Sequence, residues 1–201
     1  MKQAHLILAA AIATVSGSAS AQQAVFDMSS TTFKDGQMMP KKVANSQANF
    51  PGNKDCVGEN ISPQLSWVNP PAGTKSFAIT MVDPEGRGGG GVVHWVAYGI
   101  PADVTGFAEG EVSKDSPKYV GGKSRLGVGH YSGPCMPPNY SARHYTFVLI
   151  ATDLEPNALP PGLTKEELAL KIVPPGAPGA ATPRHEKGAT GMVGLFVHGG
   201  Y

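Results

Sequence analysis

The chain has 201 residues, of which 41% are hydrophobic and 15% are charged. This length is enough for one domain with a buried core. Its 16 basic residues nearly balance its 15 acidic residues, which argues against nucleic acid as a partner because nucleic-acid binding generally uses a strongly basic face.

The first 21 residues have the pattern of a secretory signal peptide. Lys2 precedes an apolar run from Leu6 to Val15, and Ala19-Ser20-Ala21 provides a small-residue cleavage site. The apolar run is too short for a permanent transmembrane helix, and no later segment approaches that length. We therefore expect residues 22–201 to form a single exported domain, periplasmic or secreted, with no transmembrane segment in the mature chain.

Two cysteines, Cys56 and Cys135, are present. An exported compartment permits a disulfide between them, and two buried free thiols are the alternative. Two cysteines alone make a weak metal site, so we predict no metal and no cofactor.

Short β-type runs separated by Gly and Pro dominate the chain, and they predict strands over 76–82, 93–100, 144–154 and 192–198. Alternation in the first strand places Phe77, Ile79 and Met81 on one face. Alternation in the second strand sorts its side chains into two sets: His94, Val96, Tyr98 and Ile100 on one face, and Val93, Trp95 and Ala97 on the other.

A capping box over Thr164–Glu167 predicts a helix that runs to about Val173 and stops at Pro174-Pro175. Residues 174–191 are mostly Pro, Gly and Ala and are interpreted as an exposed excursion. The predicted fold class is therefore mainly β, with two packed antiparallel sheets and one or two peripheral helices.

The stretch "DPEGRGGGGVVHW", residues 83–95, contains glycines at the spacing G-x-G-x-x-G. A dinucleotide site requires a helix after such glycines, but here they lead into a strand. We instead predict a wide hairpin with a mobile, permissive loop that brings Asp83 and His94 together at one rim. The alternative is that Asp83 only caps a turn and His94 is a core residue.

A second cluster, "GHYSGPCMPPNYSARHYTF", spans residues 129–147. Gly133-Pro134 and Pro137-Pro138 indicate a rigid, irregular loop with exposed backbone amides. The basic and hydroxyl side chains around this loop make it a plausible anion cradle. They are His130, Tyr131, Arg143, His144 and Tyr145.

These motifs, together with Asn60-Ile61-Ser62-Pro63 before Trp67, resemble the phosphatidylethanolamine-binding protein family, and most closely its bacterial Raf-kinase-inhibitor-like branch. The resemblance covers about Phe26 to Val173. It implies a large antiparallel sheet packed on a smaller one, and a small surface pocket for phosphate-type anions or phospholipid head groups. Arg143 stands where the family usually has a pocket histidine.

The resemblance implies that Asp83 and His94 are the pocket's acid and first histidine. The full set of expected ligand-binding residues is Asp83, His94, Gly133, Pro134, Arg143, His144 and Tyr145. Asp83 would hold His94 in a charged state or a fixed tautomer; the alternatives are that it accepts a proton-bearing oxygen of the ligand or the ammonium of an ethanolamine head group. His94, Arg143 and the loop amides would then attract the anion, and Tyr145 would donate a directional hydrogen bond.

The leading hypothesis is an exported, non-catalytic protein that binds a small phosphate-bearing ligand or a lipid head group. One alternative is an inhibitor or regulator of a protease or another protein partner. A second alternative is a hydrolase that uses Asp83 and His94 as a base pair, although no Gly-x-Ser-x-Gly motif supplies a nucleophile.

Overall fold

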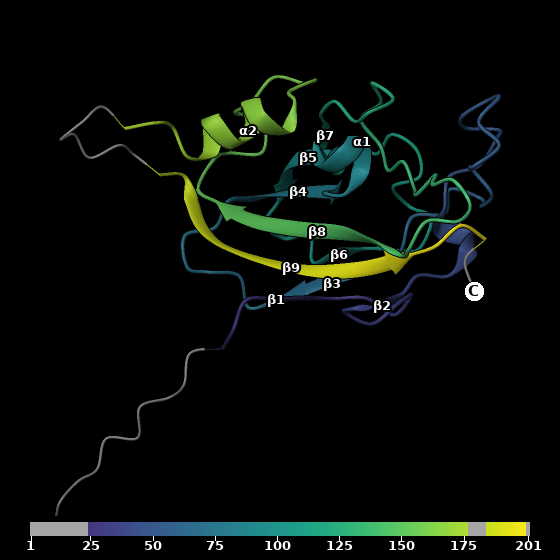
Figure 1. Ribbon diagram of the computed structural model, residues 1–201. Coiled ribbons are helices and arrows are strands. Elements are labelled where there is room, and N and C mark those ends of the chain that lie inside the picture. Colours follow the sequence, from purple (N-terminus) through teal and green to yellow (C-terminus); the bar gives the residue numbers. More distant parts are fainter. Residues whose placement is uncertain (1–23, 177–183, 200–201) are drawn as a thin grey trace, which may run out of the picture.

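The computed structural model describes residues 24–176 and 184–199 (Figure 1). In chain order the elements are β1 (Asp27–Ser29), β2 (Gln37–Met38), the 3-10 helix η1 (Lys41–Val43), β3 (Leu65–Val68), β4 (Ser76–Asp83), α1 (Gly86–Gly89), β5 (Val92–Pro101), β6 (Gly106–Phe107), β7 (Val120–Gly121), β8 (Arg143–Thr152), α2 (Lys165–Ile172) and β9 (Glu186–Phe196). The predicted signal peptide, residues 1–21, lies outside the described residues.

The strands form two sheets, in the orders β2-β9-β8-β4-β5-β7 and β1-β3-β6. Neighbouring strands are antiparallel except for β2, which runs parallel to β9. The predicted class is therefore confirmed, with one parallel pair at the edge of the larger sheet. In the described part of the chain, no helix is long and apolar enough to cross a membrane.

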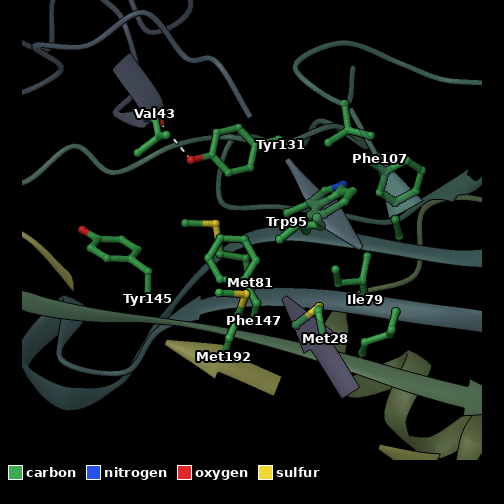
Figure 2. Packing of buried hydrophobic residues seen from close by; sticks show 14 of the residues in the cluster. Met28, Val43, Ile79, Met81, Trp95, Phe107, Tyr131, Tyr145, Phe147 and Met192 are labelled. Carbon is green, nitrogen blue, oxygen red and sulfur yellow. Dashed lines mark hydrogen bonds between the residues drawn. The ribbon is translucent and has the colours of Figure 1, made fainter. Parts of the chain in front are cut away.

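The main core fills the space between the two sheets (Figure 2). Phe77, Ile79 and Met81 of β4 all belong to it, as the alternation predicts, and Phe147 of β8 lies beside them. Trp67 reaches from β3 in the smaller sheet and contacts Phe77 edge-on, with ring centroids 5.6 Å apart. Burial of these large apolar side chains is the main stabilising contribution to the fold.

Helix α2 packs on the outer face of the larger sheet, where Leu168 and Ile172 meet Ala78 and Tyr98. Its predicted capping box is present, because the Glu167 N–H donates to Thr164 Oγ1 at 3.2 Å and the Thr164 N–H donates to Glu167 Oε2 at 2.9 Å. The helix ends at Ile172, two residues before the first of the two prolines.

A β-bulge in β5 changes the direction of His94. Val82 pairs with Val93, whereas the preceding residue Met81 pairs with Trp95, so His94 is an extra residue in the ladder. A bulge of this kind turns two consecutive side chains to the same side of a strand. His94 therefore joins Trp95 on the inner face of the sheet.

A second register shift lies at the other end of β5, beside Gly99, whose φ is +62°. It returns Ile100 to the main core, while Val96 and Tyr98 pack on the outer face. The predicted grouping of His94, Val96, Tyr98 and Ile100 on one face is therefore wrong. Simple alternation fails because two extra residues are inserted into the ladder.

Strand β9 starts at Glu186 and pairs with β8 along its whole length. The predicted excursion over 174–191 is therefore too long, and the last strand starts earlier than 192; residues 177–183 lie outside the described residues. Two glycines explain the misleading composition. A Cβ at Gly188 would lie 2.9 Å from Pro71, and one at Gly191 would lie 2.7 Å from the carbonyl oxygen of Phe147. Close packing therefore requires glycine at both positions.

Candidate functional site

Asp83 ends β4 with a buried carboxylate, and both of its oxygens are occupied. Oδ1 accepts hydrogen bonds from the N–H groups of Glu85 at 3.0 Å and Gly86 at 2.9 Å. Oδ2 accepts from Nη1 of Arg143 at 3.1 Å. Burial raises the pKa of Asp83 above its usual value, and the bond and charge of Arg143 oppose that rise.

The glycine-rich connection between β4 and β5 is a hydrogen-bonded turn. Asp83 pairs with Val92, so the predicted wide hairpin is present. The Gly91 N–H donates to the Gly86 carbonyl at 2.9 Å, and Arg87 adopts a left-handed conformation with φ +52°. A one-turn helix replaces the long helix of a dinucleotide site, and β5 follows immediately.

The His94 imidazole is buried and neutral. Its Nδ1 lies 2.7 Å from the Ser132 carbonyl oxygen. Because a carbonyl only accepts, Nδ1 carries the hydrogen and Nε2 is left as an acceptor. Burial, together with the charge of Arg125, lowers the pKa of His94 to about 3. The expected role of Asp83 is therefore taken by Ser132, which fixes the tautomer, and the ring is uncharged.

The Gly133-Pro134 loop is buried against the segment that follows η1. The Gly133 N–H donates to Asn60 Oδ1 at 2.9 Å, and the Pro134 carbonyl accepts from the Asn45 N–H at 2.8 Å. A Cβ at Gly133 would collide with the carbonyl oxygen of Val43. The expectation of exposed amides is therefore wrong for Gly133, whose N–H is already used inside the protein.

Side-chain hydrogen bonds fasten the same loop from both sides. Asn45 Nδ2 donates to Ser132 Oγ at 2.9 Å, and Asn60 Nδ2 donates to the Tyr131 carbonyl at 3.3 Å. The Tyr131 hydroxyl donates to the Val43 carbonyl at 2.8 Å (Figure 2). Asn60 is present in the motif before Trp67, whereas Asn45 and Ser132 have no sequence signal that separates them from ordinary turn residues.

Cys56 and Cys135 form a disulfide across 79 residues of sequence. Of the two alternatives, a disulfide and two buried free thiols, the disulfide is therefore the correct one. In the chain-entropy model, closing a loop of this length contributes up to about 4 kcal/mol. Because Cys135 directly follows Pro134, the disulfide also fixes the Gly133-Pro134 loop in place.

The three consecutive residues Arg143, His144 and Tyr145 begin β8 and alternate in direction. Tyr145 packs inward, with its ring centroid 5.1 Å from that of His94. Its hydroxyl points outward from the core cluster (Figure 2). Burial, followed by the charge of Asp83, raises the pKa of Tyr145, so the phenol remains a neutral donor. His144 is exposed and instead pairs with Glu85 through Nδ1.

Arg125 is a site residue that sequence reasoning missed. Its backbone N–H donates to the Val93 carbonyl at 2.8 Å, and its Nη2 donates weakly to the Gly133 carbonyl at 3.4 Å. The guanidinium lies over the Phe50 ring, 5.4 Å from the centroid. Its Nε is buried without a hydrogen-bond partner among the described residues. The sequence offers only a basic residue in a glycine-rich stretch.

Asp83, His94, Arg125, Arg143 and Tyr145 together form the polar cluster. Asp83 and His94 are each 2% exposed and Tyr145 is 1% exposed, whereas the Arg143 side chain is 18% exposed. Arg143 therefore lies over Asp83 at the protein surface, with its guanidinium 5.2 Å from the centroid of the exposed Tyr140 ring. Of the expected pocket residues, Asp83, His94 and Tyr145 converge beneath Arg143 and do not line an open pocket, whereas His144 pairs with Glu85 outside the cluster.

A family model described as phosphatidylethanolamine-binding protein matches residues 29–174. The chain belongs to this family. Similar proteins include the UPF0098 protein of Aquifex aeolicus, which is 33% identical over 76% of this chain and 83% of its own length. A protein of Mycobacterium tuberculosis called putative lipoprotein LppC is 33% identical over 62% of this chain and 59% of its own length.

The fold agrees with the family assignment. The crystal structure of Escherichia coli YbcL, described as a member of the mammalian family, superposes with a TM-score of 0.71. It is 25% identical in sequence and covers 87% of this chain and 99% of its own. The predicted family is confirmed. Asp83, His94, Gly133, Pro134 and Tyr145, which the resemblance suggested as pocket residues, meet in and around the polar cluster.

Proposed function

We propose that the protein is a non-catalytic binder of small phosphate-type anions or phospholipid head groups, and that the polar cluster is its binding site. The observation that carries this proposal is a charge imbalance. Arg143 neutralises Asp83, whereas Arg125 has no ion-pair partner among residues 24–176 and 184–199. A largely buried cation with an unused Nε–H is favoured by an anionic partner.

The neutral groups of the cluster define the orientation of the ligand. Tyr145 offers a hydroxyl donor. His94 offers Nε2 as an acceptor, which suits the protonated oxygen of a phosphate monoanion or monoester better than a fully ionised oxygen. The two guanidinium groups can bind the remaining oxygens in a bidentate geometry. Charge-assisted hydrogen bonds contribute roughly 1.5–3 kcal/mol each, which suits millimolar to micromolar affinity.

Entry of the ligand requires Arg143 to move. Its side chain is the exposed member of the cluster, and Asp83 keeps two backbone N–H donors when Arg143 leaves. We therefore propose that the bound anion replaces Asp83 as the ionic partner of the Arg143 guanidinium. The Asp83 carboxylate then keeps only its two backbone N–H donors, which compensate its negative charge in part. The remaining charge repels the ligand and limits the affinity for ligands with more than one negative charge.

An amide NMR titration with inorganic phosphate and phosphoethanolamine tests the binding proposal. We expect saturable shifts at Ser132, Gly133 and Tyr145, and at least a tenfold loss of affinity in Arg125→Gln. The matched control is Arg184→Gln, which removes the same charge from an exposed pair with Glu186. If these amides stay still up to tens of millimolar ligand, the polar cluster is not an anion site.

We also propose export, on the strength of the signal-like residues 1–21 and the lipoprotein name of one relative. Mass spectrometry of the protein expressed from its full-length gene in a bacterial host tests this directly. We expect a mature chain that begins near Gln22 in the periplasmic fraction. A cytoplasmic protein with an intact N-terminus would contradict export.

The hydrolase alternative receives no support from the geometry. The Asp83 carboxylate bonds to Arg143 and to two backbone amides, and the hydrogen on His94 Nδ1 goes to Ser132. An acid and a histidine that work together in catalysis are normally hydrogen-bonded to each other. We therefore do not propose catalysis by this pair.

A further inference from the structure

A second polar concavity, here called the basic cleft, lies on the opposite side of the larger sheet from the main core. It has a volume of about 610 Å³ and lies between the α1 turn, the segment that follows β7, and the start of α2. Figure 1 shows α1 and α2 on the same side of this sheet. Val82 and Val93, whose side chains point away from the main core, form its floor.

The lining of the basic cleft is strongly cationic. Arg87, Lys123, Arg125 and Lys165 line it, and in the part of the chain that the structure describes Glu166 is the one carboxylate that does so. Lys165 already pairs with Glu166, with Nζ 3.1 Å from Oε1. The other three cations form no ion pair within the described ranges 24–176 and 184–199, in a protein whose overall charge is close to zero.

Arg87 and Arg125, two of these cations, repel each other. The charge of Arg87 contributes to lowering the pKa of Arg125, although burial is the larger cause. An anion held between them would remove the repulsion and gain charge-assisted hydrogen bonds.

The backbone holds the cleft in shape without a ligand. The Lys123 N–H donates to the Leu163 carbonyl at 2.8 Å, and the Arg125 N–H donates to the Val93 carbonyl at 2.8 Å. This segment therefore lies along β5 like a further strand and is joined to the residues before α2. A backbone that is already held in place loses less conformational entropy when a ligand binds.

We propose that the basic cleft is a second ligand site, which adjoins the polar cluster at the shared residue Arg125, for a small compound that carries two or more phosphate-type negative charges. Three unpaired cations favour a polyanion over a single-charged ligand. The volume is larger than one phosphate needs, so a diphosphate or a phosphorylated polyol fits. Among the described residues, no aromatic side chain lines the cleft, which disfavours recognition of a base by stacking.

Two sources could supply this chemistry: a soluble organic diphosphate, or the phosphorylated head group of an anionic lipid. Both present the same oxygens to the same cations. A soluble ligand would enter the cleft by itself, whereas a lipid head group would also bring the protein to a membrane surface. The experiment therefore has one arm for each source.

In the first arm, the full mature chain is titrated with inorganic pyrophosphate while amide NMR shifts are followed, with glycerol as the neutral control. We expect saturable shifts at Gly89–Gly91, Lys123 and Ser124. The variant Arg87→Gln/Lys123→Gln should weaken binding at least tenfold. The matched control Lys41→Gln/Lys54→Gln removes two exposed charges elsewhere and should leave the affinity unchanged.

In the second arm, the protein is sedimented with vesicles that contain cardiolipin, whose head group carries two phosphates, or with vesicles of phosphatidylcholine only. Binding to the cardiolipin vesicles but not to the phosphatidylcholine vesicles, lost in Arg87→Gln/Lys123→Gln, assigns the cleft to lipid head groups. A response to pyrophosphate without vesicle binding assigns it to a soluble ligand. The proposal is overturned if the cleft responds to neither probe. It is also overturned if Arg87→Gln/Lys123→Gln and the control Lys41→Gln/Lys54→Gln bind with equal affinity. Shifts at Ser132 and Tyr145 report the polar cluster separately, so failure of one site is distinguishable from failure of the other.

Discussion

The Arg143 guanidinium lies 3.1 Å from Asp83 Oδ2, so the buried acid at the end of β4 has an ionic partner before any ligand arrives. The pairing has a consequence for stability as well as for binding. Asp83 is 2% exposed, and a carboxylate at such a position is costly without a compensating charge. Arg143 therefore serves as a structural counter-ion in the free protein.

Replacing Arg143 by Gln should destabilise the protein at neutral pH by about 1–3 kcal/mol, because Asp83 keeps only its two backbone donors. The folded pKa of Asp83 is already raised, so ionising this group destabilises the fold as pH rises from the unfolded value of 3.8 through the folded one. Loss of Arg143 widens that window. Urea unfolding should therefore give a larger difference from wild type at pH 7 than at pH 4; equal differences would contradict the ion pair.

His94 makes a different contribution to pH dependence. Its folded pKa is about 3 and its ordinary value is 6.5, so the unfolded chain binds a proton in this window and the folded protein does not. The stability associated with neutral His94 is complete above about 6.5 and decreases as pH falls toward 3. As the pH falls from 7.5 to 5, wild type should lose unfolding free energy that His94→Gln does not lose, so the two values should approach each other. The NMR signals of the His94 imidazole in wild type should not move over that range.

The fold was largely predictable from local patterns, together with the family resemblance. The alternation at Phe77, Ile79 and Met81 identifies β4, and the capping box identifies α2. The face of His94 was not predictable, because a bulge adds a residue to one strand relative to its partner, and one strand read alone does not reveal it. The true start of β9 was hidden for a related reason. Its glycines are required by contacts with distant residues, and read locally they indicate a loop.

The residues of the candidate site also fall into those that the sequence predicted and those that only tertiary contacts reveal. Asp83, His94, Gly133 and Tyr145 lie in recognisable motifs, so the convergence of these segments could be expected. Arg125 could not be found, since its guanidinium reaches the polar cluster only because the segment after β7 hydrogen-bonds to β5. The partner of His94 also depended on tertiary structure: the Ser132 carbonyl, a backbone group without a sequence signal, took the role assigned to Asp83.

Reduction of the Cys56–Cys135 disulfide should lower stability by about 2–4 kcal/mol and loosen the Gly133-Pro134 loop. Urea unfolding with and without dithiothreitol measures the first effect. Hydrogen exchange at the Gly133 amide measures the second, because this N–H is protected by Asn60. The variant Cys56→Ser/Cys135→Ser is the control and should be insensitive to dithiothreitol; an unchanged midpoint on reduction of wild type would show that the bridge contributes nothing.

A single methyl group at Gly133 tests how tightly the loop is packed. The Cβ of Gly133→Ala would collide with the Val43 carbonyl oxygen, a backbone atom that cannot rotate away. We expect a loss of about 1–3 kcal/mol in unfolding free energy and a weaker Tyr131 hydrogen bond to the same carbonyl. Gly90→Ala is the matched control, since its Cβ would meet the Arg87 carbonyl at an ordinary 3.4 Å. Thermal unfolding of the two variants side by side gives the comparison. Equal midpoints would mean that the segment after η1 yields to the loop, and that the polar cluster is less rigid than its hydrogen bonds indicate.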